Sequence, residues 1–103
     1  MTQPRKVVEA LKRRVGYLNV LATVMDGSFS HSSRFLRNFN LVVPQQTTFD
    51  HDIRYLRDRG LIDSQLVRIL KRDKNGRLQG TRVAYFRITK AGRRFLKRHR
   101  GDN

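Results

Sequence analysis

The first quarter of the chain carries apolar residues at the spacing of a helix. Val8, Leu11, Val15, Leu18, Ala22 and Met25 follow one another at intervals of three and four residues, the repeat of a helix that packs along one seam. Gly16 divides this stretch. We predict a core helix over residues 17–25, preceded by a helical extension over residues 1–16 that is free to pair with a second subunit. The predicted dimerisation residues are Val8, Leu11, Val15 and Leu18. One long helix packed within its own monomer is the alternative.

A short helix is predicted next, in the stretch SSRFLRNFNLV. Ser32 stands at its start as the N-cap, because a serine side chain can accept a hydrogen bond from the free backbone N–H groups of the first turn. Phe35, Leu36 and Phe39 are expected to face inward. Pro44 follows and biases the residue before it away from helix, so we expect a turn before the next element.

The stretch TTFDHDIRYLRDRGLI predicts a longer helix. Phe49, Ile53 and Leu56 are spaced at i, i+4 and i+7, which places them on one buried stripe. A threonine at position 47 or 48 is expected to cap the start of this helix. Gly60 is expected to end it, since glycine readily adopts the left-handed conformation found after a helix.

The last third of the chain predicts a β-hairpin and a final helix. Two β-rich runs, SQLVRIL and RVAYFRI, flank the stretch KRDKNGRLQGT. Its Asn75-Gly76 pair is a strong short-range signal for a hairpin. The final helix is predicted from Thr89 onward, with Phe95 and Leu96 buried. Residues 28–30 are expected to form a short extended connector between the first two helices. The predicted order is therefore helix, short strand, helix, helix, hairpin, helix.

This order and these residues resemble a winged helix-turn-helix. In regulators of the MarR, ArsR and PadR kind, the recognition helix ends in a leucine, charged residues and Gly-Leu-Ile/Val, and a wing and a Gly-bearing helix follow. The matching residues here are Leu56, Gly60, Leu61, Ile62, Tyr85, Ile88, Thr89 and Gly92.

The resemblance covers roughly residues 17–96 and implies an α+β fold, mainly α. A three-helix core and a β-hairpin wing are expected, with an N-terminal helical extension and a short C-terminal helix. Residues 1–16 would form the extension, residues 17–99 the winged helix-turn-helix domain and residues 100–103 a disordered tail.

The charge of the chain and its distribution indicate a function. The 103 residues include 23 Lys and Arg against 8 Asp and Glu, a net charge of +15. Most of the excess lies in residues 68–100, where Asp73 is the one acid, whereas residues 15–33 contain no Lys or Arg. One part of the chain therefore builds the core while another faces a polyanion. The abundance of arginine suits bidentate contacts with phosphates and guanine edges.

The triplet Asp50-His51-Asp52 suggests a metal or catalytic site, but helical geometry argues against it. Successive residues are ~100° apart around a helix, so the two carboxylates diverge by ~200°. His51 has no second histidine at i+4, as a helical zinc motif requires. We expect no metal, no cofactor, no small-molecule ligand and no enzymatic activity. Since the chain has no cysteine and no long apolar run, we expect it in the cytoplasm, associated with the nucleoid.

Two surfaces are predicted to contact double-stranded DNA. The outward face of the helix that follows Pro44 holds the residue types used to read bases. Its predicted contacts are Gln45, Gln46, Thr47, Thr48, Asp50, His51, Arg54 and Arg57. The wing would lie on backbone phosphates or in a minor groove. Its predicted contacts are Lys71, Arg72, Lys74, Asn75, Arg77 and Arg82.

The function predicted from these features is that of a transcriptional regulator, most simply a repressor, that binds a specific DNA sequence as a homodimer. The main alternative is a nucleic-acid-binding protein without sequence preference. It would act in chromosome architecture, in replication or partition, or on RNA or the ribosome. A protein adaptor whose basic surface meets an acidic partner is a third class.

Overall fold

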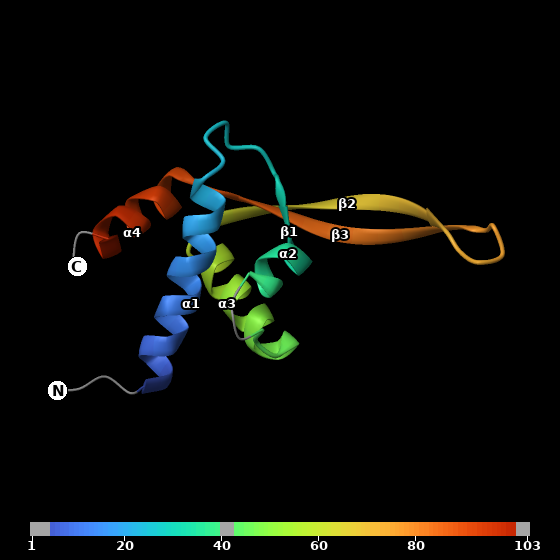
Figure 1. Ribbon diagram of the computed structural model, residues 1–103. Coiled ribbons are helices and arrows are strands. Elements are labelled where there is room, and N and C mark those ends of the chain that lie inside the picture. Colours follow the sequence, from blue (N-terminus) through green and yellow to red (C-terminus); the bar gives the residue numbers. More distant parts are fainter. Residues whose placement is uncertain (1–4, 40–42, 101–103) are drawn as a thin grey trace.

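The computed structural model describes residues 5–39 and 43–100, and within them the chain is an α+β protein (Figure 1). The helices gather at the inner end of a three-stranded antiparallel sheet. The elements in chain order are α1 (Arg5–Ala22), β1 (His31–Ser32), α2 (Ser33–Asn38), α3 (Gln46–Asp58), β2 (Ile62–Arg72), β3 (Leu78–Ile88) and α4 (Lys90–Arg100). This arrangement is consistent with a winged helix and has the element order predicted from the sequence.

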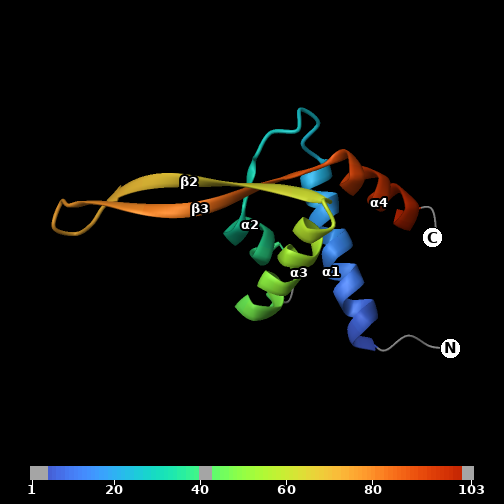
Figure 2. The same cartoon turned by 180° about the vertical axis from the view of Figure 1, so that it is seen from behind.

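The sheet has the order β1-β3-β2, and its outer part is a long two-stranded hairpin. The pairing of β2 with β3 runs from Ile62 opposite Ile88 to Arg72 opposite Leu78. β1 pairs with β3 only at Tyr85 and Phe86. The remaining pairs, residues 66–72 with 78–84, extend beyond β1 and project from the body of the molecule (Figure 2). We call this projecting part the ribbon.

The hairpin turn occurs at the predicted place. The backbone N–H of Asp73 donates to the carbonyl oxygen of Arg77 at 2.9 Å, and Gly76 has a φ of 79°. Asn75 has a negative φ, like every other described residue except three glycines. The connection is therefore a three-residue loop with glycine in the left-handed position, rather than a two-residue turn that needs two such residues.

The core lies where α1, α3 and the inner end of the sheet meet, and α1 runs between α3 and α4 (Figures 1 and 2). The predicted stripe of α3 is confirmed, because Phe49, Ile53 and Leu56 are all buried. The other buried apolar residues are Tyr17, Leu18, Leu21, Leu36, Leu61, Ile62, Phe86, Ile88 and Leu96.

α1 is one continuous helix that passes through Gly16, so the alternative of a single long helix is the one observed. It ends at Ala22, earlier than predicted, and Met25 beyond it is 83% exposed instead of lying on the seam. Leu18 is completely buried in the core of this chain. It therefore has no surface left for a second subunit, unlike the half-buried Val8 and Leu11.

α2 begins as predicted, because the Oγ of Ser32 accepts a hydrogen bond from the backbone N–H of Phe35 at 3.2 Å. Its expected inward face is wrong in part. Leu36 is fully buried, but Phe35 is 53% and Phe39 48% exposed. Successive residues on a helix are about 100° apart, so Phe35 points away from the core that buries Leu36. Phe39 lies beyond the last helical residue, Asn38, as the C-cap. The ring of Phe35 instead lies 5.0 Å from that of His31.

α3 starts at Gln46, with Gln45 as an N-cap whose side chain makes no capping hydrogen bond. The predicted threonine cap is therefore wrong, since both threonines lie inside the first turn. The predicted end is confirmed, because Gly60 has a φ of 68° and follows the last turn.

The start of α4 is also as predicted. The Oγ1 of Thr89 accepts from the N–H of Gly92 at 3.0 Å and donates to the carbonyl oxygen of Gly60 at 2.6 Å. Leu96 is buried and Phe95 is half-buried. Gly92 lies so close to the carbonyl of Leu61 that a side chain there would collide with it. This close approach lets α4 pack directly on the start of β2.

Candidate nucleic-acid interface

α3 presents a polar outer face because its apolar stripe is turned into the core. Asp50, His51, Arg54 and Arg57 are all exposed on this face. Gln45, Gln46 and Thr47 are exposed at its N-terminal end, and Thr48 is half-buried. The structure therefore brings the predicted helix residues onto one accessible surface.

A hydrogen-bonded chain joins α2 to the first turn of α3. The Nη1 of Arg37 donates to the Oε1 of Gln46 at 3.1 Å, and the Nε2 of Gln46 donates to the Oδ1 of Asp50 at 2.8 Å. The Nε of Arg37 also donates to the carbonyl oxygen of Pro44 at 2.9 Å. Arg37 therefore links α2 to Pro44 and orients the amide of Gln46. Arg37 was missed by the sequence analysis because its role depends on where the turn folds.

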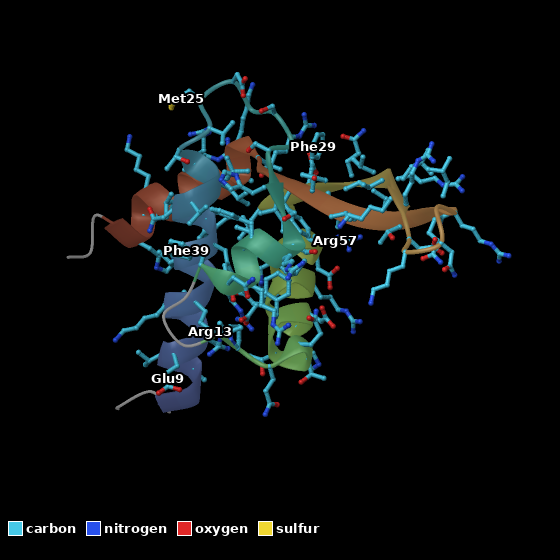
Figure 3. The ribbon with its side chains drawn as sticks, turned by 45° about the vertical axis from the view of Figure 1, so that its right-hand side comes forward. Glu9, Arg13, Met25, Phe29, Phe39 and Arg57 are labelled. Carbon is cyan, nitrogen blue, oxygen red and sulfur yellow. The ribbon has the colours of Figure 1, made fainter. Side chains whose placement is uncertain are left out.

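A groove of about 520 Å³ runs between the outer face of α3 and the strand β3. Arg57 extends from α3 into the angle between that helix and the ribbon (Figure 3). The groove is lined by Ser33, Gln46, Phe49, Asp50, Ile53, Arg54, Arg57, Asp58, Ala84 and Phe86. A second recess of about 360 Å³ lies between α2 and α3, where Arg34 and Arg37 add positive charge. The basic surface thus continues from α3 onto α2.

The ribbon has two different sides, because side chains alternate across a strand. Arg68 lies directly opposite Arg82, and Arg72 lies four residues further along the same side of β2. This side, which we call the basic side, is continuous with Ala84 and Phe86, which line the groove beside α3. All three arginines are exposed.

The predicted wing contacts are distributed over both sides of the ribbon. Arg72 and Arg82 lie on the basic side, whereas Lys71 lies on the opposite side. Lys74, Asn75 and Arg77 belong to the turn, all of them exposed. Arg68 was not among the predicted contacts. A two-residue turn at Asn75-Gly76 would have paired Arg68 with Val83, so its place opposite Arg82 follows only from the three-residue loop of the structure.

Asp73, the one acid in residues 68–100, makes hydrogen bonds within this turn. The Oδ1 of Asp73 accepts from the backbone N–H groups of Asn75 and Arg77, both at 2.9 Å, and its Oδ2 accepts from the Nε2 of Gln79 at 3.4 Å. Aspartate commonly closes a turn in this way. Asp73 therefore holds the tip of the ribbon in one conformation.

Asp52 is the buried member of the Asp50-His51-Asp52 triplet, with 1% of it exposed. The Nε of Arg13 lies 2.8 Å from its Oδ2, and the Nε of Arg14 lies 3.0 Å from its Oδ1. Arg13 projects from α1 toward α3 (Figure 3). Hydrogen bonding to Asp52 raises the pKa of Arg13 above its ordinary value. These contacts tie the middle of α1 to α3.

Tyr55 completes this junction between the two helices. The guanidinium of Arg14 lies 3.8 Å from the centre of its ring, and that of Arg59 lies 4.1 Å from the same centre. Such cation–π contacts are favourable for arginine. This junction was not predicted from the sequence. Its signal was present, since Asp52 lies three residues after Phe49 and four before Leu56, on the buried side of the helix.

Some basic residues of α4 make hydrogen bonds within the protein, whereas others are exposed. Arg93 donates from Nη1 to the carbonyl oxygen of Ala22 at 3.3 Å and from Nη2 to that of Val24 at 3.0 Å. It thereby satisfies carbonyl groups at the end of α1, where a positive charge is also favoured by the helix dipole. Arg94, Lys97 and Arg98 are exposed.

Neither a metal cluster nor a membrane span is found in the described part of the chain. No three histidine or carboxylate side chains among residues 5–39 and 43–100 are grouped to hold an ion. No helix in the same ranges is long and apolar enough to cross a membrane.

The fold has a counterpart among solved structures. The crystal structure of TA0346 from Thermoplasma acidophilum, a proposed transcriptional regulator, matches it with a TM-score of 0.70. The match covers 93% of this chain and 82% of the other, at 16% sequence identity. No protein-family model matches the sequence, and no curated sequence matches it significantly. At this identity the likeness concerns the fold.

Proposed function

We propose that this protein is a winged helix-turn-helix transcriptional regulator that binds a specific sequence of double-stranded DNA as a homodimer. α3 would act as the recognition helix in the major groove, and the ribbon as the wing on the backbone or in the adjacent minor groove. The observation that carries the proposal is the groove between α3 and β3. Arg54 and Arg57 line it on one side, and the basic side of the ribbon continues from it on the other.

The outer face of α3 supplies the chemistry of base readout. Arg54 and Arg57 can each donate two parallel hydrogen bonds to the O6 and N7 of guanine, the commonest specific contact in the major groove. Gln46 can pair with adenine in the same way, and its amide is already oriented by Arg37 and Asp50. A face built only for solubility needs none of these groups.

The remaining predicted contacts would contribute to binding affinity rather than to sequence specificity. Gln45 and Thr47 lie at the N-terminus of α3, where backbone N–H groups favour a phosphate, and His51 is exposed more than one turn further along the helix. The ribbon and its turn add arginine and lysine side chains that displace counterions from the DNA backbone. The net charge of +15 suits this role.

The dimer would form along the N-terminal half of α1. Val8, Leu11 and Val15 are half-buried there, and Val7 is 51% exposed. Two copies related by a two-fold axis would read a pseudo-palindromic site, with half-sites one helical turn of DNA or a multiple of it apart. Repression by blocking the polymerase is the simplest mechanism, in the cytoplasm at the nucleoid.

The test is selection of bound duplexes from a random library at about 150 mM salt, near physiological ionic strength. An enriched palindrome supports a specific dimeric regulator, and an enriched single half-site removes the dimer from the proposal. Arg54→Ala is the matched variant. It should lose roughly 1–3 kcal/mol of discrimination at one base position. Arg94→Ala on α4 is the control and should leave the selected sequence unchanged.

A binder without sequence preference is the second candidate. Its supporting observation is the spread of exposed basic residues over α2, the ribbon and α4, far beyond one helix face. In that case the library would be retained without enrichment, and Arg54→Ala would lower the affinity for all sequences equally.

A further inference from the structure

The basic side of the ribbon also carries three exposed leucines. Leu66 is 65%, Leu70 59% and Leu78 61% exposed. The strand register places all three on the same side as Arg68 and Arg82. Large apolar residues and arginines therefore alternate along one surface of a hairpin that projects from the molecule.

The register also explains why Leu66 and Leu70 are exposed. Leu66 lies opposite Ala84, and Leu70 lies opposite Gly80, so β3 offers almost no side chain to cover them. On the opposite side, by contrast, Val67 faces Val83 across the strands and is only 37% exposed. Cross-strand pairs of branched side chains shield each other in this way. The apolar surface on the basic side is thus open to a binding partner.

The positive charge of the basic side indicates what kind of partner can bind there. Two copies of the chain packed through this side would bring their arginines together around the leucines, and like charges in close contact repel. A surface on which arginines alternate with apolar groups instead suits DNA, whose phosphates attract the arginines and whose base steps accept apolar wedges. The choice of DNA as the partner rests on the proposed DNA-binding function.

The shape of the ribbon adds a mechanical constraint. A two-stranded ribbon fits the major groove, which is about 12 Å wide, but an undistorted minor groove is only about 6 Å wide. The ribbon can therefore bring its leucines against the bases of a minor groove only if that groove opens. Opening a minor groove with apolar side chains unstacks base steps and bends the duplex.

We propose that the basic side of the ribbon opens the minor groove beside the site read by α3 and bends the DNA. Leu66, Leu70 and Leu78 form the apolar surface that enters the groove. Arg68, Arg72 and Arg82 bind the phosphates along its two walls. The bend gives the protein a further source of specificity, because flexible pyrimidine–purine steps deform more readily than stiff ones.

The experiment measures binding and bending separately on one duplex. A selected site is placed in a duplex of about 30 bp, far shorter than the ~150 bp persistence length of DNA, with a fluorophore at each end. Fluorescence anisotropy gives the affinity, and energy transfer between the ends at saturating protein gives the bend. The variants are Leu70→Ser with Leu78→Ser on the basic side and, as matched control, Val67→Ser with Ile69→Ser on the opposite side.

We expect the wild-type protein to increase energy transfer, and we expect the pair Leu70→Ser with Leu78→Ser to abolish the increase while the control pair retains it. Binding without any increase for the wild-type protein would overturn the bending proposal and leave DNA recognition intact. Equal bending by both variant pairs would overturn the role of the leucines. Absence of binding to any duplex would instead contradict the proposed function.

A second measurement uses only the wild-type protein and does not depend on how the variants fold. A duplex with a two-base bulge beside the site is already bent and partly unstacked. The protein should bind it about tenfold more tightly than the intact duplex, a difference of about 1.4 kcal/mol. Equal affinity for the two duplexes would contradict the proposal.

Discussion

The Nε of Arg13 in α1 lies 2.8 Å from the Oδ2 of Asp52 in α3, although the two residues are 39 positions apart in the sequence. Asp52 is 1% exposed, and Arg14 binds its other oxygen. The helix proposed to read DNA is thus held by the helix proposed to form the dimer.

Asp52→Asn tests the strength of this junction. The substitution keeps the shape of the side chain but removes the charge that both arginines contact. We expect the free energy of unfolding to fall by roughly 2–3 kcal/mol. This is less than the roughly 3–5 kcal/mol for breaking a fully buried charge pair, because the arginines can still reach water. Urea unfolding followed by circular dichroism measures it.

Asp63→Asn is the control for the loss of a carboxylate. Asp63 pairs with Arg87 at 3.2 Å, and both side chains are about half exposed. Such surface pairs contribute roughly 0–1 kcal/mol. Equal losses at positions 52 and 63 would show that the buried junction does not stabilise the fold.

Arg93→Ala should destabilise the protein although the residue lies in a basic surface helix. It removes two hydrogen bonds from a charged donor to the carbonyl groups of Ala22 and Val24. We expect a loss of about 1–2 kcal/mol. The neighbouring Arg94→Ala, whose side chain is exposed, should stay within about 0.5 kcal/mol of the wild type. Thermal unfolding distinguishes the two.

Gly92→Ala should be more damaging than its helical position suggests. The added Cβ would collide with the carbonyl of Leu61 and the side chain of Ile88, so α4 would have to move away from β2. Overpacking of this kind costs about 1–3 kcal/mol. Alanine in the middle of an unobstructed helix would instead stabilise it, and a rise in the melting temperature would therefore refute the close approach.

The dependence of DNA affinity on salt should report which arginines touch phosphates. Removing one phosphate contact lowers the slope of log K against log salt by about 0.9. Arg68→Ala should show this decrease. Arg87→Ala is the control, because Arg87 pairs with Asp63 on the opposite side of the hairpin, and its slope should be unchanged.

Asp26 gives a prediction for acid pH. Hydrogen bonds from the backbone N–H and the side chain of Ser28 hold the pKa of Asp26 below its ordinary value of 3.8. A carboxyl whose pKa is lower in the folded state stabilises the protein above its unfolded pKa, and this contribution is lost as the pH falls through the folded pKa. Carboxyl NMR titration measures the value. Ser28→Pro, which lacks the N–H donor, should return the pKa toward 3.8.

The order of elements could be predicted from the sequence because it depends on local patterns. The stripe of Phe49, Ile53 and Leu56, the cap at Ser32 and the glycine after α3 each require only neighbouring residues. The hairpin likewise follows from the Asn-Gly pair between two β-rich runs. The predictions that were wrong on this level concern short helices and helix ends, where a shift of one residue changes the direction of each side chain. They are those at Met25, Phe35, Phe39 and the threonine cap.

The tertiary structure alone decided which charged residues are structural and which are free to bind. By itself the sequence determined that the chain is basic, where its helices and hairpin lie, and that an excess of arginine falls in its last third. It could not determine that Asp52 meets Arg13 and Arg14, or that Arg93 reaches the end of α1, 69 and 71 residues away. The physical reason is that the sequence does not show whether a charged side chain is solvated or paired, because its partner is set by how distant elements pack.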